Sequence, residues 1–392
     1  MSVKTKKIIL VSSFRPRECG IAAFGKDLSN SLKNYNKGFD VEAIPVNEPG
    51  GEKRQYDKSI KMCISQNKKA DYLKASDYIN NSDADALSLQ HEYGLYGGKS
   101  GNYILTLLKN TKKPILTTLH TITKNPCIAE KRTLILIAKY SDFLVVMADS
   151  ALTTLKNVYG ISGNKVIMIP HGVQNIEFQD QQSAKKTLDL EDRLIVSTFG
   201  LIGRSKGIEY AIESLAMIKN EFPNILYLII GKTHPSIITS EGEEYRNSLI
   251  VRINKLGLDH NVMFVNRYVN GEEYTNYLLA TDVYLTPYPN LEQVTSGTLA
   301  YAMSAGRVCI STPYIYAKEL LKDGLGILLP SLDSKVLAET ISKFLSSNGN
   351  KIKMEKRNHL YTRAMTWENV SKKYAHILRD IITKQDKYVA KL

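Results

Sequence analysis

The chain has 392 residues, which is long for one domain and comfortable for two. Its 52 Lys and Arg outnumber its 39 Asp and Glu, so the net charge is +13, while hydrophobic residues make up 43% of the sequence. This composition is typical of an α/β protein, and no apolar run approaches the roughly 20 residues of a membrane span.

The positive charge narrows the classes of partner. Nucleic-acid binding favours a basic stripe interleaved with aromatic residues. The densest basic stretch, from Arg54 to Lys74, is interrupted by Asp57 and Asp71 and is typical of a solvated face. We therefore expect no nucleic acid, and we keep an anionic substrate or an anionic membrane surface as the partners that suit the charge.

Neither the N-terminus nor the cysteines indicate an extracellular protein. The basic start is followed by an apolar run of only Ile8–Val11, which is typical of a first β-strand and not of a signal peptide. The cysteines Cys19, Cys63, Cys127 and Cys309 are widely spaced without a C-x-x-C pair, so neither a zinc site nor a disulfide framework is indicated. We expect a cytoplasmic protein, with peripheral association at the inner face of the membrane as the alternative.

Strand-like and helix-like patterns alternate along nearly the whole chain, which predicts right-handed crossovers and parallel sheets covered on both faces. The strand-like runs are Lys7–Ser12, Val41–Pro45, Ala86–Gln90, Ile115–Leu119, Phe143–Met147, Val166–Ile169, Leu194–Phe199, Ile225–Ile230, Val262–Val265, Val283–Thr286, Val308–Ser311 and Ile327–Leu329. Two consecutive sets of strands predict an α/β protein with two doubly wound, Rossmann-like domains. Their expected bounds are 1–173 for the first domain, 174–192 for a linker, 193–365 for the second domain, and 366–392 for a C-terminal helix that packs back on the first domain.

In such folds ligands bind beyond the carboxyl ends of the strands. The segments that follow these ends are rich in glycine and polar residues, and they include Ser13–Gly20, Gln90–Gly94, His120, His171, Gly200–Gly207, Gly231–Pro235 and Asn266–Tyr268. Two polar sheet edges predict a ligand cleft between the domains.

One stretch, Leu285–Thr312, reads as strand, loop, helix and strand. Small residues open its helix and leave backbone N–H groups uncovered at the positive end of the helix dipole, as an anion such as phosphate requires. These residues are Thr295, Ser296, Gly297 and Thr298. Glu292, in the preceding loop, is placed to accept hydrogen bonds from sugar hydroxyls. The alternative is a plain capped helix.

Two motif-like patterns have the wrong context. Asp83 and Asp85 form a D-x-D, which binds metal in some sugar transferases, but they precede a strand where the metal motif belongs after one. The segment Gly94–Ser100 resembles a phosphate-binding P-loop with one residue too few between its glycines, and loop length fixes which N–H groups converge.

The order and spacing of several short motifs resemble the large family 4 of retaining glycosyltransferases, which have the GT-B fold. The motifs are Gly20-Ile-Ala, Thr118-Leu-His, Ile169-Pro-His-Gly-Val, Lys206-Gly, Asp282-Val-Tyr-Leu-Thr-Pro, Ala302-Met-Ser-Ala-Gly and the closing Trp367 helix. The amino-acid sequences of segments such as SGTLAYAMSAG resemble one bacterial subgroup of this family, which has a modified donor-site motif.

The resemblance implies transfer of a sugar from a nucleotide-sugar, held mainly by the C-terminal domain, to an acceptor held by the N-terminal one. It implies retention of anomeric configuration and no metal or other cofactor, since cationic side chains neutralise the diphosphate. Lys206 matches the family's phosphate lysine. The family's arginine is Leu201 here, and Arg204 is a candidate substitute.

The family's two glutamates, eight positions apart, fall on Gln293 and Tyr301. The second typically holds the nucleotide ribose, so Tyr301 puts the ribose contact and the donor class in doubt. Glu292, shifted by one position, is our candidate for the first, which contacts the transferred sugar.

Other positions complete the candidate site. His120 matches the family's active-site histidine near the donor sugar, and Gly20 and Gly231 follow strands as donor-binding residues. His91 and Glu92 are candidates for acceptor binding, with fixing of the loop after them as the alternative. Tyr268 is a candidate for stacking on the base, with core packing as its alternative.

The leading hypothesis is a metal-independent retaining glycosyltransferase acting on a glycan or small hydroxyl acceptor. The alternatives are a GT-B phosphorylase that uses inorganic phosphate, and a non-catalytic GT-B subunit that supports a partner transferase. The oligomeric state is not indicated by the sequence.

Overall fold

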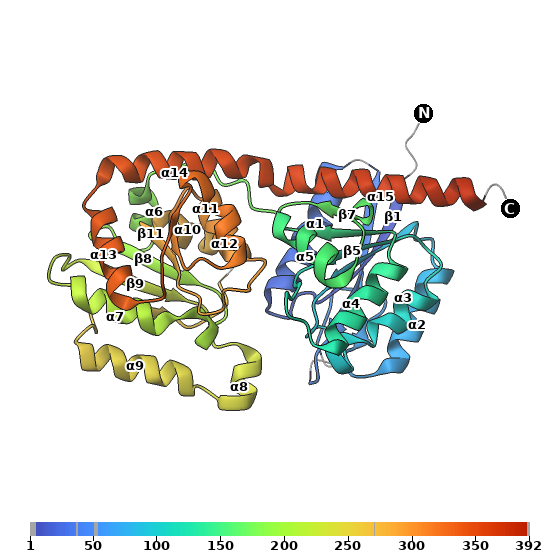
Figure 1. The fold of residues 1–392 in the computed structure, drawn as a ribbon, viewed down its shortest axis with the longest axis horizontal. Helices are drawn as coiled ribbons and strands as arrows, with labels where there is room; N and C mark the ends of the chain where they lie inside the picture. Colours follow the sequence, from blue (N-terminus) through green and yellow to red (C-terminus); the bar gives the residue numbers. More distant parts are fainter. Residues whose placement is uncertain (1–4, 37, 51–53, 270, 390–392) are drawn as a thin grey trace. The chain divides into compact units, whose positions relative to one another are not determined.

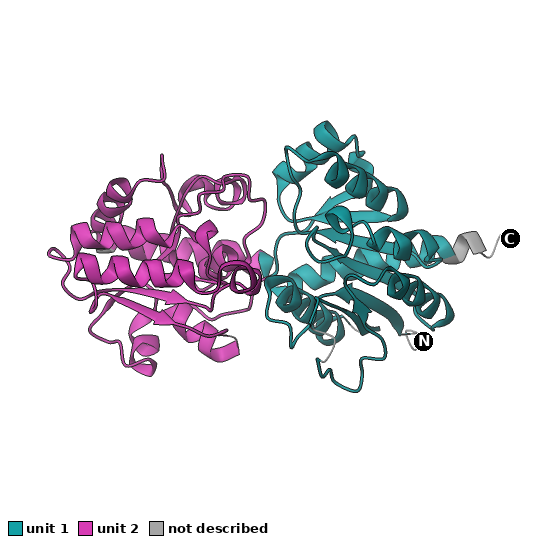
Figure 2. Ribbon diagram, turned by 90° about the horizontal axis from the view of Figure 1, so that it is seen from below, with its two compact units in different colours: residues 1–172, 365–392 teal, residues 173–364 magenta. Residues whose placement is uncertain are grey.

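The chain forms two compact units in a computed structural model, which describes residues 5–36, 38–50, 54–269 and 271–389. Unit 1 comprises residues 1–172 together with 365–392, and unit 2 comprises residues 173–364 (Figure 2). Residues 174–192, for which we expected a linker, contain a helix and belong to unit 2. Each unit is a parallel sheet with helices packed against it (Figure 1).

Unit 1 is built on a seven-stranded parallel sheet of order β3-β2-β1-β4-β5-β6-β7. Its strands are β1 (Lys6–Ser12), β2 (Phe39–Asn47), β3 (Ile64–Ser65), β4 (Ala86–His91), β5 (Ile115–Leu119), β6 (Phe143–Val146) and β7 (Val166–Met168). Its helices are α1 (Gly20–Tyr35), α2 (Lys69–Asn81), α3 (Ile104–Asn110), α4 (Ile128–Tyr140), α5 (Asp149–Tyr159) and α15 (Trp367–Val389), with 3-10 turns at Lys99–Gly101, Gly163–Lys165 and Arg363–Met365, the last at the boundary with unit 2.

Unit 2 is built on a six-stranded parallel sheet of order β10-β9-β8-β11-β12-β13. Its strands are β8 (Leu194–Phe199), β9 (Ile225–Ile230), β10 (Val262–Val265), β11 (Val283–Thr286), β12 (Val308–Ser311) and β13 (Ile327–Leu328). Its helices are α6 (Gln181–Thr187), α7 (Ile208–Ile218), α8 (Pro235–Glu241), α9 (Glu244–Leu256), α10 (Gly271–Ala280), α11 (Gly297–Ser304), α12 (Ile315–Leu320), α13 (Ser334–Leu345) and α14 (Asn348–Thr362), with 3-10 turns at Arg204–Lys206 and Lys322–Gly324.

The predicted fold class is confirmed: two doubly wound, all-parallel sheets. Several strands, including β5, β8, β9 and β11, have the predicted bounds. The short edge strand β3 was not predicted, because two paired residues leave no periodic signal.

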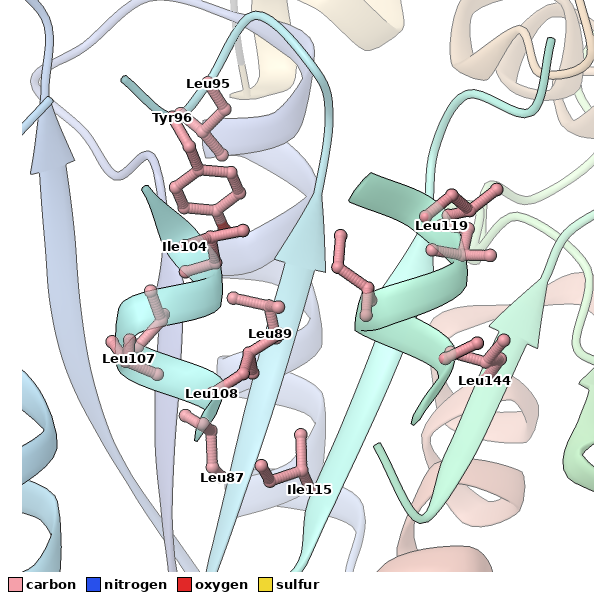
Figure 3. Close-up of a cluster of buried hydrophobic side chains, with 14 of the residues drawn as sticks. Leu87, Leu89, Leu95, Tyr96, Ile104, Leu107, Leu108, Ile115, Leu119 and Leu144 are labelled. Atoms are coloured by element: carbon pink, nitrogen blue, oxygen red, sulfur yellow. The ribbon is translucent and has the colours of Figure 1, made fainter. Parts of the chain in front are cut away.

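Side-chain alternation along the strands divides the interior of unit 1 between the two faces of the sheet. Ile9 and Val11 of β1 join the cluster formed with α2, α3, α4 and α5, part of which Figure 3 shows. Ile8 and Leu10 point to the other face and join the cluster formed with α1 and α15. Burial on both faces explains why these strands read as continuous apolar runs.

The C-terminal helix α15 completes that second cluster. Trp367 at its start lies against Phe24 of α1, with ring centroids 5.0 Å apart, and against Gly172, where a side chain would collide with the indole ring. Tyr374, further along α15, lies within hydrogen-bonding distance of Thr118 of β5, with their oxygens 3.0 Å apart. The helix is thus a structural part of unit 1, although it is separated in sequence from the rest of that unit by unit 2.

Helix α6 is held inside unit 2 by a buried ion-pair network. Lys185 of α6 donates to Asp282 at 2.6 Å, and Lys351 of α14 donates to the other oxygen of the same carboxylate at 2.5 Å. The two ammonium groups hold the pKa of Asp282 below its usual value, although burial alone would raise it. This network anchors the segment around Lys185 to the sheet, since Asp282 directly precedes β11.

None of the helices in the described residues is both long enough and apolar enough to span a lipid bilayer.

Candidate active site

The order of the strands marks one place in unit 2 for a ligand. Strand β8 is flanked by β9 on one side and β11 on the other, so the chain reverses its direction of winding between β8 and β11. In open parallel sheets, ligands bind outside the carboxyl ends of the strands at such a switch point. The residues there are Phe199, which ends β8, Gly200 directly after it, and Pro287 and Tyr288 after β11.

Lys206 is fixed at this switch point. Its ammonium donates to the Tyr288 hydroxyl at 2.8 Å and lies 4.3 Å from the centre of the same ring. The turn that holds it is tight: Gly207 has a φ of +59°, and a side-chain carbon there would lie 2.0 Å from the Pro287 carbonyl oxygen. Because Tyr288 is buried, the lysine is oriented before any ligand arrives.

The N-terminus of α11 lies beside this lysine. Thr298, in its first turn, has its hydroxyl 3.5 Å from that of Tyr288, and Ser296 is the N-cap, accepting from the Leu299 N–H at 3.4 Å. A side-chain carbon at Gly200 would contact both the Lys206 ammonium and the Thr298 methyl group, at 3.5 and 3.7 Å. The Lys206 ammonium, the Tyr288 and Thr298 hydroxyls and the N-terminus of α11 therefore lie around Gly200, which carries no side chain. This arrangement suits a phosphate group.

A second tight approach holds the neighbouring loop. Gly231, directly after β9, has a φ of +141°, and a side-chain carbon there would lie 2.0 Å from the Gly200 carbonyl oxygen. The buried Arg246 of α9 donates to the Gly231 carbonyl at 3.3 Å and to Thr233 and Glu243, each at 3.2 Å. The two glycines bring the ends of β8 and β9 together, and Arg246 fixes the loop from behind. Sequence reasoning missed Arg246, because its partners lie on other elements.

Tyr288 was also missed, because the Pro-Tyr-Pro context read as loop punctuation. Its position directly after a central strand was the available signal, since every residue at a strand's carboxyl end is a candidate in this fold.

The remaining donor candidates take different positions. Arg204 is exposed and pairs with Glu241 and Glu244 of α8 and α9, at 3.6 and 3.5 Å. Glu292 lies on an exposed loop, where its N–H donates to Asn290 at 3.0 Å. Thr295 and Gly297 flank the N-cap of α11, and the Thr295 carbonyl accepts from Gln293 at 2.8 Å.

Tyr301 belongs to an aromatic group at the same edge of the sheet. Its ring contacts Tyr274 of α10 edge to face, with centroids 5.8 Å apart, and Tyr274 contacts Phe199 at 5.0 Å. Burial raises the pKa of the Tyr274 phenol, and the half-buried Tyr268 makes a smaller contribution in the same direction. Through Phe199, the aromatic group adjoins Gly200 in the chain.

In unit 1, three histidines gather at the carboxyl edge of the sheet. The Nε2 of His120, which follows β5, lies 2.9 Å from Gln90 Oε1. The backbone N–H of His120 donates to the His91 carbonyl at 3.0 Å. Burial lowers the pKa of His120 to about 3, with smaller contributions from His171 and His91. With the amide oxygen as acceptor, Nε2 carries the proton and Nδ1 remains an acceptor.

His91 and His171 are equally enclosed. His91 is fully buried between Tyr93 and Tyr96, and both of its ring nitrogens lack a hydrogen-bond partner within the described residues. Burial lowers the pKa of His91 to about 3 and that of His171 to about 4. His171 Nδ1 lies 2.8 Å from the Gly172 carbonyl oxygen.

Glu92 accepts from Thr121 at 2.5 Å and from the Tyr93 N–H at 2.9 Å, which ties the loops after β4 and β5 together. Burial raises the pKa of Glu92. Gly20 begins α1 at an exposed position where a side-chain carbon would meet nothing within 4 Å. The structure therefore groups His91, Glu92 and His120 at one edge of the sheet, and their roles in binding stay predictions.

The D-x-D carboxylates lie at the opposite edge. Asp85 accepts from the Lys6 ammonium at 3.1 Å and the Lys7 N–H at 2.8 Å, and Asp83 pairs with the Lys7 ammonium at 2.7 Å. Lysines at the start of β1 thus occupy both carboxylates. Across the described parts of the chain, no group of three or more His, Cys, Asp or Glu residues is placed to hold a metal ion.

Comparison with solved structures assigns the fold to the GT-B class of glycosyltransferases. Sucrose-phosphate synthase from Thermosynechococcus elongatus is 17% identical, with 97% of this chain and 100% of that chain covered and a TM-score of 0.77. HepE from Anabaena, in complex with UDP and glucose, is 14% identical, with 96% and 100% covered and a TM-score of 0.75. The α,α-trehalose-phosphate synthase (UDP-forming) from Burkholderia vietnamiensis is 14% identical, with 97% and 99% covered and a TM-score of 0.68.

Comparison of the sequence with known protein families gives a more specific result than the fold. Residues 179–367, nearly the whole of unit 2, match the family described as glycosyl transferases group 1. The match covers the Lys206 site and the α11 N-terminus, and together with the fold it supports a role in glycosyl transfer. No curated protein matches the sequence significantly.

Proposed function

We propose that this protein is a retaining glycosyltransferase that moves a sugar from a nucleotide-sugar donor to a hydroxyl group of a glycan or small acceptor, without a metal ion. The observation that carries the proposal is the pre-oriented Lys206 at the β8–β11 switch point, next to the N-terminus of α11. The family match over unit 2 supports the same reaction class.

The chemistry of the donor explains why a lysine and a helix N-terminus suffice. When the bond between the anomeric carbon and the phosphate oxygen breaks, negative charge grows on the leaving diphosphate. The Lys206 ammonium, the Thr298 hydroxyl and the N–H groups of α11 are fixed before the reaction, so they stabilise this charge without reorganising. Because these groups supply the stabilisation that a metal ion would otherwise give to the diphosphate, we propose that the enzyme needs no metal ion.

The acceptor is assigned to unit 1. His120 is neutral because burial lowers its pKa to about 3, so at neutral pH it offers a hydrogen-bonding nitrogen and no charge. A neutral imidazole suits a sugar hydroxyl better than a phosphate. His91 and Glu92 lie at the same sheet edge, and we propose that they contribute to the binding of the acceptor.

The identity of the donor is tested first. A thermal-shift screen of UDP-, GDP-, ADP- and dTDP-sugars is expected to show one nucleotide that stabilises the protein, by roughly 2.7 kcal/mol at 100 times its dissociation constant. The same screen with inorganic phosphate and sugar phosphates distinguishes a phosphorylase, which binds these ligands, from a transferase that uses a nucleotide-sugar. A protein stabilised by phosphate and by no nucleotide would contradict the proposal.

Retention and metal independence are tested on the transfer reaction itself. Proton NMR of the product is expected to show the same anomeric configuration as the donor, and turnover is expected to survive EDTA. Inversion would contradict the first expectation, and loss of activity in EDTA with recovery in Mg²⁺ or Mn²⁺ would contradict the second.

A further inference from the structure

Helix α4 of unit 1 presents an apolar stripe to solvent. Ile128 is 88% exposed and Ile135 is 38% exposed, at a spacing of two helical turns. The opposite side of the helix carries Leu134, Ile137 and Ala138, which are buried in the core of unit 1. The exposed isoleucines are therefore not needed to hold the helix on the sheet.

The charged side chains around this stripe are cationic. Lys131, Arg132 and Lys139 are exposed on the same side of α4, and Lys124 is exposed in the segment before it. Glu130, the acid in the first turn, is turned to the helix end, where its carboxylate accepts from the Cys127 N–H at 2.9 Å. We call Lys124, Ile128, Lys131, Arg132, Ile135 and Lys139 the α4 face.

Exposed apolar side chains on two helices of unit 2 provide a comparison. On α9 of unit 2, Val251 is 67% exposed, but the exposed charges of that helix include both Glu244 and Lys255. On α14 of unit 2, Ile352 and Leu360 are 52% and 74% exposed, and the exposed charges of that helix, Lys353, Lys356 and Arg357, are cationic. The α4 face shares this combination of apolar and positive exposure with α14, but it belongs to unit 1, the unit that carries the proposed acceptor residues.

We propose that the α4 face docks this protein on an anionic lipid surface. In such docking the isoleucines enter the boundary between headgroups and acyl chains, and the cations lie at the level of the lipid phosphates. A protein partner would favour aromatic anchors that fill pockets. Isolated aliphatic side chains on a convex helix, surrounded by long flexible cations, fit a fluid interface instead.

The place of α4 in the chain gives the docking a consequence. The helix follows β5, and the segment Thr121–Cys127 leads from His120 to Ile128. Because a crossover helix starts at the carboxyl edge of its sheet, Ile128 lies at the edge that carries His91 and Glu92. Docking there brings the lipid surface to the proposed acceptor residues, and, resting on the proposed function, it identifies an acceptor hydroxyl carried on a lipid.

Vesicle binding tests the docking without any sugar or nucleotide. The full chain is expected to co-sediment with vesicles of phosphatidylcholine and phosphatidylglycerol, weakly with phosphatidylcholine alone, and less as salt is raised. The double variant Lys131→Glu/Arg132→Glu is expected to lower the partition coefficient at least about 25-fold, since each cation near such a surface contributes about fivefold. Ile128→Asn is expected to lower it about tenfold.

Matched changes on α9 serve as controls. Val251→Asn and Lys255→Glu alter an exposed aliphatic and an exposed lysine in unit 2, and both are expected to leave the partition coefficient within about twofold. Equal loss from the α4 and α9 variants would overturn the proposal, because it would mean that total charge and not the α4 face governs binding. Circular dichroism and thermal unfolding of each variant check that the fold is retained.

A fluorescent label locates the contact. Cys127, which is exposed directly before Ile128, is labelled with a polarity-sensitive dye in a Cys19→Ser/Cys63→Ser background, and its emission is expected to shift to the blue on anionic vesicles. The same dye at Val251→Cys, with Cys127→Ser added, is expected not to shift. No binding to anionic vesicles, binding that survives the double variant, or binding to polyglutamate as tight as that to vesicles overturns the proposal. Because none of these measurements involves turnover, their failure is distinct from failure of the proposed function.

Discussion

The two units share one design and differ in the chemistry of the same edge. In each, the first strand lies between two others, β1 between β2 and β4 and β8 between β9 and β11, so both have a switch point at the carboxyl ends. Unit 1 carries buried, neutral histidines there, whereas unit 2 carries the Lys206 ammonium, hydroxyl groups and a helix N-terminus. Topology determines where a ligand can bind, and the residues after each strand determine which charge it can have.

The difference also has an energetic side. The histidines of unit 1 remain neutral because they are enclosed, which lowers their pKa values to about 3 for His91 and His120 and about 4 for His171. Lys206 places its ammonium group at a half-buried position beside the face of Tyr288. We therefore expect mild acid to destabilise unit 1 through its histidines, and the function of unit 2 to depend on a single charge.

The largest expected effect comes from removing that charge. Lys206→Ala is expected to lower kcat about 10²–10³-fold, equivalent to roughly 3–4 kcal/mol, because the leaving diphosphate loses its fixed cation. Thermal unfolding is expected to change little, since the Lys206 side chain is half-buried and its ammonium donates to the hydroxyl of Tyr288. Steady-state kinetics with the donor found in the screen gives the measurement.

Lys255→Ala, an exposed lysine of α9, is the matched control and is expected to leave kcat unchanged. Near-normal turnover in Lys206→Ala would remove the phosphate role and with it the contrast between the two edges.

The close approach of the β8 and β9 loops is the next test. Gly231→Ala is expected to destabilise unit 2 by roughly 3 kcal/mol, because its φ of +141° is unfavourable for alanine and its side chain would lie 2.0 Å from the Gly200 oxygen. Donor binding is expected to weaken with it, as Gly200 lies beside Lys206. Gly163→Ala in unit 1 is the control, since a side chain there meets nothing within 4 Å. A stable Gly231→Ala variant with normal donor affinity would contradict the geometry.

The histidines of unit 1 predict how its stability depends on pH. A buried histidine with a pKa of about 3 binds its proton less readily than the unfolded chain, where the pKa is about 6.5. The folded state of unit 1 therefore has its full stability above about pH 6.5 and loses stability as the pH falls toward 3. At pH 5 the loss is roughly 2 kcal/mol per histidine. Trp367, the single tryptophan, packs on Phe24 in unit 1, so its fluorescence in urea reports this unit.

His91→Phe provides the internal comparison. The variant removes a titrating ring whose nitrogens lack partners, so it is expected to reduce the loss of stability between pH 7 and pH 5 by about a third, on the basis of three histidines. An unchanged pH dependence would show that His91 is not neutral and buried in solution.

Sequence patterns alone predicted most of the architecture, because strands buried on both faces produce apolar runs that end at glycine or polar residues. The same rule pointed to the segment Gly200–Gly207 and to the N-cap segment of α11, and the family resemblance singled out Lys206 within the first. It could not show that Arg204 turns to Glu241 and Glu244, since those partners lie on elements that only the fold brings near.

Burial limited the prediction in a second way. The histidine after β5 was recognisable from its motif, but the lowered pKa of His120 depends on enclosure by Phe24 and on His171 and His91, which come from other parts of the chain. Tyr288 likewise gained its role through contact with Lys206, which is 82 positions away in sequence.

The smallest expected effect concerns Tyr301, where this chain departs from the family that it resembles. Its ring contacts Tyr274 in the aromatic group of unit 2, and its phenol offers one hydrogen bond, whereas a carboxylate can accept from both ribose hydroxyls. Tyr301→Glu is therefore expected to tighten nucleotide binding a few-fold, or to leave it unchanged because the lost ring contact offsets about 1 kcal/mol. It is also expected to increase the preference for ribonucleotides over deoxyribonucleotides.

Tyr301→Phe separates packing from hydrogen bonding, since it keeps the ring and removes the hydroxyl. Isothermal titration of the three proteins with UDP, dUDP and phosphate distinguishes the cases. If the site binds inorganic phosphate as a phosphorylase would, Tyr301→Glu places a negative charge near that phosphate and weakens its binding, because like charges repel across a partly desolvated site. If neither the parent protein nor the variant binds a nucleotide, the donor assignment of unit 2 fails, and the contrast between a cationic and a neutral sheet edge would need another ligand to explain it.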